Sequence, residues 1–216
     1  MIEIINNTID FVKKSLSGSE GGHDWWHVYR VWQLSKQIAA HETGADLLIV
    51  EPGALLHDIA DSKFHNGDEE IGPQMAREFL QTQNLSEQSV EHIINIIRNI
   101  SFKDSFEEQR FTSKELQIVQ DADRLDAIGA IGIARTFNYG GYKGRELYNP
   151  NIKPETNLTK KKYKNSSAPT INHFYEKLLT LKDKMNTETG KRMARHRHNF
   201  LEQFLIEFYD EWKGIK

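Results

Sequence analysis

Apolar residues recur at intervals of three and four along almost the whole chain, which is the spacing of amphipathic helices. No segment alternates between apolar and polar residues for long enough to predict a strand. The pattern therefore predicts an all-α protein. The expected helices cover residues 2–17, about 24–41, 52–60, a segment that opens at 73, 87–100, about 112–137, about 171–185 and 188–212.

Local signals place three of the expected helix starts. Pro52 stands before an apolar run, and proline is favoured in the first turn of a helix. Thr112 and Glu115 have the spacing of a capping box. Thr187 is a candidate N-cap for the last helix.

The stretch 138–172 differs from the rest, because Gly140, Gly141, Gly144 and Pro150 interrupt its first part. We expect a long loop here, followed by two C-terminal helices. Its lysines at 160–162 are consistent with a lid over a polyphosphate or with a solvated insertion. No repeat or linker divides the chain, so we expect a single domain over 1–216.

Composition narrows the chemistry. The chain has 216 residues, of which 38% are hydrophobic and 27% charged, as in soluble globular proteins. It has no cysteine, which excludes disulfides, thiolate metal sites and a cysteine nucleophile. The net charge of −3 argues against a nucleic-acid partner. No targeting or membrane segment is apparent, so we expect a cytoplasmic protein without a membrane partner.

A few ionisable residues lie on apolar helical faces. His27 shares a stripe with Val31 and Leu34, and His57 and Asp58 interrupt the apolar run 54–60. Asp121, Asp123 and Asp126 lie within the last long helix before the loop, and periodicity alone does not choose between them. Taken singly, each of these residues is explained by a buried hydrogen bond or a salt bridge.

Taken together, they indicate a metal site. Two histidines and two aspartates on three helices offer four ligands with a formal charge of −2, which a divalent cation neutralises. Nitrogen and oxygen donors of this mix suit one divalent transition metal better than magnesium. We expect manganese first, with iron, nickel, cobalt and zinc as alternatives.

Three segments resemble the HD-domain metal-dependent phosphohydrolases, whose pattern is a histidine, a later His-Asp pair and a final aspartate. The matching segments are 27–31 (HVYRV), 56–59 (LHDI) and 122–125 (ADRL). Segments 22–27 (GHDWWH), 100–102 (ISF) and 119–129 (VQDADRLDAIG) further resemble the small bacterial YpgQ/YedJ-type branch. The resemblance covers nearly the whole chain and implies an HD-domain helical bundle.

The resemblance also implies the ligand set and the reaction. It assigns the metal to His27, His57, Asp58 and Asp123, and so selects Asp123 among the three aspartates. Asp61, one turn after His57, is expected to position or deprotonate a water, or to be a solvated helix-end residue. His23 is expected to contact phosphate or the leaving group. Candidate phosphate contacts are Arg30, Lys63, Lys103 and Arg124, although the two arginines are also placed to hold carboxylates.

Members of this branch split nucleoside triphosphates, especially deoxynucleotides, into monophosphate and pyrophosphate, and we expect this reaction. The nearest alternatives are a nucleoside monophosphate phosphatase and a phosphodiesterase of the same superfamily. The alternative from a different class of protein is a metal-containing nucleotide-binding module without turnover.

Overall fold

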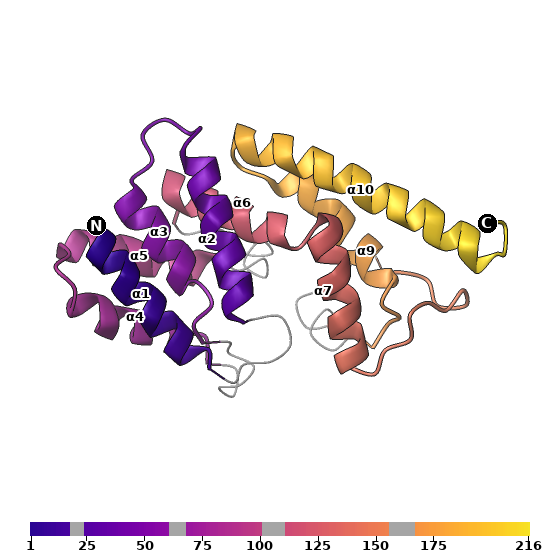
Figure 1. The fold of residues 1–216 in the computed structure, drawn as a ribbon, viewed down its shortest axis with the longest axis horizontal. Helices are drawn as coiled ribbons and strands as arrows, with labels where there is room; N and C mark the ends of the chain where they lie inside the picture. The colour runs from indigo at the N-terminus through magenta and orange to yellow at the C-terminus, as the bar shows by residue number, and fades with distance from the viewer. Residues whose placement is uncertain (18–23, 61–67, 101–110, 156–166) are drawn as a thin grey trace. The chain divides into compact units, whose positions relative to one another are not determined.

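The computed structural model describes residues 1–17, 24–60, 68–100, 111–155 and 167–216. These residues contain helices and connecting segments and no strand, which confirms the all-α prediction (Figure 1). The helices are α1 (Ile2–Ser15), α2 (Trp25–Ala39), α3 (Leu47–Leu56), α4 (Ile71–Gln81), α5 (Glu87–Asn99), α6 (Lys114–Asp126), α7 (Gly129–Tyr142), α9 (Asn172–Glu176), the 3-10 helix η3 (Leu178–Lys184) and α10 (Glu188–Trp212).

The chain forms two compact units, Met1–Asp123 and Arg124–Lys216, and the boundary falls within α6. The expected single domain over 1–216 stays a prediction. Among the described helices, none combines the length and the apolar composition required to cross a membrane.

Helix α3 is the central element of the N-terminal unit. It packs against α1, α2 and α5, and α5 packs in turn against α4. Every residue of α3 from Ile49 to Leu56 is buried. A helix that is apolar on all sides is stable only when other helices cover it, so α3 forms the core of this unit.

Helix α3 begins five residues before the predicted start at Pro52, at Leu47. The Asp46 carboxylate caps it by accepting from the Leu48 backbone N–H at 2.8 Å. Pro52 is therefore inside the helix, where its missing N–H removes one backbone hydrogen bond. The helix ends at Leu56, with His57 as its C-cap, rather than at residue 60.

The predicted helix over 112–137 is two helices, α6 and α7. The capping bond at the start of α6 comes from Ser113 rather than Thr112, because the Ser113 hydroxyl accepts from the Leu116 N–H at 3.0 Å. The Glu115 carboxylate accepts instead from the Asp46 N–H at 3.1 Å. The predicted capping box of Thr112 and Glu115 was therefore wrong.

The break between α6 and α7 depends on Gly129, which has a φ of 76°. This left-handed conformation is rarely accessible to residues with a Cβ. A Cβ at this position would also lie 3.1 Å from Cγ of Arg197, whose guanidinium donates to the Leu125 carbonyl at 2.6 Å. The sequence pattern shows apolar residues on both sides of the break and so did not predict it.

In the C-terminal unit, α10 packs against α7 and η3, and η3 packs against α9. The rings of Phe137, Phe174 and Phe204 lie together, with centroids 5.5–6.0 Å apart. Thr187 caps α10 as predicted, since its hydroxyl accepts from the Gly190 N–H at 2.9 Å. The predicted helix over 171–185 is instead the short α9 followed by η3.

The expected loop over 138–172 begins later than predicted, because α7 continues to Tyr142 and includes Gly140 and Gly141. Residues 143–155 and 167–171 contain neither helix nor strand. The lysines at 160–162 lie outside the described residues, so their role as a lid stays a prediction.

Candidate metal centre

His27 lies in the first turn of α2 with its side chain inside the N-terminal unit, where the residue is 2% exposed. The Asp24 carboxylate accepts from the His27 backbone N–H at 2.9 Å and so caps the helix at this point. Val31 and Leu34, on the same stripe, are also buried. The predicted inward face of α2 is therefore confirmed.

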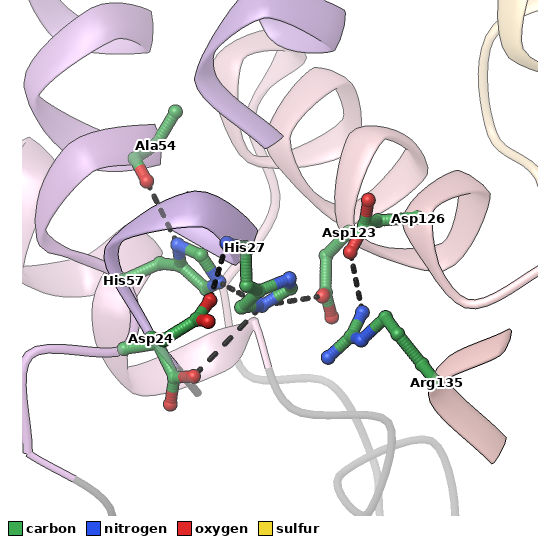
Figure 2. A network of polar contacts seen from close by, with 8 residues as sticks. Asp24, His27, Ala54, His57, Asp123, Asp126 and Arg135 are labelled. Carbon is green, nitrogen blue, oxygen red and sulfur yellow. Dashed lines mark hydrogen bonds and ion pairs between the residues drawn. The ribbon is translucent and has the colours of Figure 1, made fainter. Parts of the chain in front are cut away.

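His57 follows α3 directly, and its ring is tied to the helix it ends. Its Nδ1 lies 2.7 Å from the Ala54 carbonyl oxygen. A carbonyl only accepts, so Nδ1 carries the proton and Nε2 presents a lone pair. This Nε2 lies 3.3 Å from Nε2 of His27 (Figure 2).

Asp123 of α6 completes a group of three. Its Oδ1 lies 3.6 Å from Nε2 of His27, and the ligand atoms of His27, His57 and Asp123 all lie within 4.8 Å of one another. Two ligands about 2.1 Å from one metal ion are about 3.0 Å apart at a right angle and about 3.4 Å apart in a tetrahedral site. The separation of the two imidazole nitrogens therefore fits donors that share a cation.

Asp58 lies beside this group. Its Oδ2 is 3.8 Å from Nε2 of His27, and its side chain is 18% exposed. It approaches His27 only slightly less closely than Asp123 does, but it is not part of the group of three. Its role as a fourth ligand stays a prediction.

The other two aspartates of α6 are buried more deeply than Asp123. Asp121 is 0% exposed and Asp126 is 1% exposed. Asp126 is ion-paired with Arg135, which compensates its burial without a metal (Figure 2). Burial also lowers the pKa of Arg197, and the nearby Asp126 carboxylate opposes that shift.

Of the predicted catalytic and phosphate-contacting residues, only Arg30 and Arg124 lie among the described residues. Arg30 is half-buried on α2. Arg124 donates a hydrogen bond from Nη1 to the Lys184 carbonyl within the C-terminal unit. His23, Asp61, Lys63 and Lys103 lie outside the described residues, and the roles expected for all six stay predictions.

Sequence reasoning missed the groups that hold the ligands in place. One is the Ala54 carbonyl, for which the sequence carries no signal. Another is Asp24, whose position three residues before His27 is a capping signal. A third is the pair of Trp32 and Glu51, in which Nε1 donates to the buried carboxylate at 2.8 Å and joins α2 to α3.

The HD domain model matches residues 25–128, which include all four expected ligands. The chain is 37% identical over 206 residues to the uncharacterized protein YpgQ of Bacillus subtilis (strain 168), covering 95% of this chain and 92% of that protein. It is also similar to the crystal structure of an HD-superfamily hydrolase from Bacillus thuringiensis, with a TM-score of 0.76, 43% identity, and coverage of 98% of this chain and 97% of that one. A structure of Bacillus subtilis YpgQ in complex with ADP matches with a TM-score of 0.74 and 33% identity, covering 98% of this chain and 100% of that one.

Proposed function

Because this chain belongs to the HD domain family and is an HD-superfamily hydrolase, we propose that it converts a nucleoside triphosphate into the monophosphate and pyrophosphate. The observation that carries the proposal is the group of His27, His57 and Asp123 with converging ligand atoms. The ADP complex of Bacillus subtilis YpgQ supports a nucleotide as the ligand.

The donor set fits a divalent transition metal, which His27, His57 and Asp123 would hold, with Asp58 beside them. Such an ion supplies Lewis-acid chemistry and an acidified water. Of the metals that suit these donors, we propose manganese.

The protein's own contribution begins with orientation. The hydrogen bond to Ala54 fixes the His57 ring and places the proton of the neutral ring on Nδ1, so that Nε2 faces the metal position. The Asp24 cap fixes the backbone at His27. Ligands held in this way need little rearrangement when the site fills, which favours tight binding.

We propose further roles for residues that the resemblance singles out. Asp61 positions or deprotonates the attacking water, and His23 contacts the phosphates or the leaving group. Arg30, Lys63, Lys103 and Arg124 are the candidate phosphate contacts. Positive groups at these places would stabilise the charge that develops on the phosphoryl oxygens.

The test is a substrate panel with separate detection of pyrophosphate and orthophosphate. The protein is purified without chelators, its metal content is measured, and deoxynucleoside tri-, di- and monophosphates are supplied with manganese. We expect pyrophosphate from triphosphates. The His57→Ala and Asp123→Ala variants should each lose about a hundredfold or more of this activity, together with bound metal.

The matched control is His41→Ala, which removes an exposed histidine outside the group of three. It should keep both the metal and the activity. Orthophosphate released from monophosphates would favour the phosphatase alternative. Bound metal without turnover would favour a nucleotide-binding module, and the absence of metal would refute the site itself.

A further inference from the structure

The C-terminal unit is strongly basic, which the net charge of the whole chain conceals. Residues 124–216 contain 18 lysines and arginines against 10 aspartates and glutamates, a formal charge of +8. Residues 1–123 contain 10 lysines and arginines against 21 aspartates and glutamates, a formal charge of −11. The charges of the two units add up to the overall net charge of −3. Such a concentration of positive charge attracts anions to this unit.

The same unit contains a hollow of about 470 Å³. Ligand sites for small molecules have volumes of about 300–1,000 Å³, so the hollow is large enough for one. It is formed by the end of η3, the segment that follows it, and the first turns of α10. The lining residues are Lys182, Asp183, Met185, Lys191, Arg195 and Asn199.

Lys182 is held at this hollow by a buried histidine. Its Nζ lies 3.2 Å from Nε2 of His198, a residue that is 6% exposed. An ammonium group only donates, so the histidine nitrogen accepts. The Nδ1 of His198 is buried and has no hydrogen-bond partner among the described residues. The exposed Glu202 carboxylate also approaches this Nε2, to 3.3 Å.

The other cations come from one face of α10. Lys191, Arg195 and Asn199 are spaced by four residues, so their side chains lie in one row. Lys191 is ion-paired with Glu188 at 2.7 Å. Arg195 forms no hydrogen bond or salt bridge with the described residues, but with Lys191, which donates a hydrogen bond to Glu188, its charge lowers the pKa of the Glu188 carboxyl. Its guanidinium offers donors in a fork that matches phosphate.

We propose that this hollow binds a small ligand with two or more linked phosphates, at a site made only of C-terminal residues. Three cations and one amide converge on it, against a single lining carboxylate, Asp183. The Met185 side chain offers an apolar contact for a nucleoside, which makes a nucleoside polyphosphate one source of the phosphates and an inorganic polyphosphate the other. The site goes beyond the proposed reaction and needs no turnover.

The test measures equilibrium binding by calorimetry in the full chain carrying His57→Ala, with chelator present, so that neither hydrolysis nor the metal group contributes. The probes are tripolyphosphate and ATP. Arg195→Gln and Lys182→Gln should each weaken binding by about tenfold, as expected for charge-assisted hydrogen bonds. Asp183→Asn should tighten it by about threefold, because a repulsive charge is removed.

The matched control is Arg192→Gln, an exposed residue of α10 that does not line the hollow, and it should change affinity by less than about twofold. Tighter binding of ATP than of tripolyphosphate assigns a nucleotide, and equal binding assigns the phosphates alone. The proposal is overturned if neither probe binds, or if Arg192→Gln matters as much as Arg195→Gln. It is also overturned if a single-stranded oligonucleotide binds more tightly than both probes and loses affinity equally with either substitution. Because the variant measured is inactive, these outcomes are independent of the proposed reaction.

Discussion

At the scale of single residues, the metal ligands depend on bonds that their neighbours make with the backbone. The Asp24 carboxylate accepts a hydrogen bond from the His27 backbone N–H, and the Ala54 carbonyl accepts one from Nδ1 of His57. Neither bond involves a ligand atom. Each bond sets the direction of a ligand atom. Losing one should therefore weaken metal binding by more than the accompanying loss of folding stability would explain.

The Asp24→Ala variant should lose both folding stability and metal affinity. The change removes the α2 cap, which should lower the free energy of unfolding by about 1 kcal/mol. It should also weaken manganese binding by about tenfold, because His27 is in the turn that loses its cap. Both quantities follow from urea unfolding and metal titration of the same protein.

Asp46→Ala is the matched control for this prediction. Asp46 caps α3 through the Leu48 N–H, at the end of α3 opposite to His57. We expect a similar loss of stability and unchanged manganese affinity. If the two variants lose metal affinity equally, the cap at Asp24 acts through stability alone.

The ligand residues were predictable to different degrees. His27 and His57 were visible because a polar residue on an apolar face requires a partner. Burial alone does not tell which aspartate of α6 is a metal ligand, because a metal ion and an arginine can each compensate a buried carboxylate. Arg135, the partner of Asp126, follows it across a helix break, where helical spacing carries no information.

At the scale of elements, the helical character of the chain was predictable and several helix boundaries were not. Apolar periodicity reports which residues face a core, and that signal continues through the break between α6 and α7. The break is encoded by one backbone conformation at Gly129. Similarly, the start of α3 is set by the Asp46 carboxylate, which outweighs the preference of Pro52 for a first turn.

Two glycine substitutions test this account of α7. Gly129→Ala should lower the free energy of unfolding by about 1–2 kcal/mol, because alanine is strained at a φ of 76° and its Cβ would press on Arg197. Gly141→Ala should instead raise it by up to about 1 kcal/mol, since Gly141 is helical and a Cβ there meets nothing within 4 Å. Thermal and urea unfolding of the two variants give the comparison. Equal effects of the same sign would contradict the role given to the Gly129 conformation.

At the scale of the whole molecule, the charge is divided between the two units, and this affects their response to acid. The C-terminal unit carries +8 and contains His173. The pKa of His173 is lowered from 6.5 to about 3, mainly by desolvation, with the Lys177 and Arg145 cations acting in the same direction. The folded protein therefore keeps this ring neutral at pH values where the unfolded chain protonates it.

His173 makes the folded protein less stable as the pH falls. Above pH 6.5 neither state binds the proton, so the contribution of His173 to stability is fully present; it is lost as the pH falls from 6.5 towards 3. Relative to His173→Gln, which cannot be protonated, the wild-type chain should lose about 2 kcal/mol of unfolding free energy between about pH 7 and pH 5. Carboxylates that titrate in this range affect both proteins equally. Urea unfolding at the two pH values measures the difference. Equal pH dependence in the wild-type chain and His173→Gln would show that His173 gains its proton without cost in the folded state.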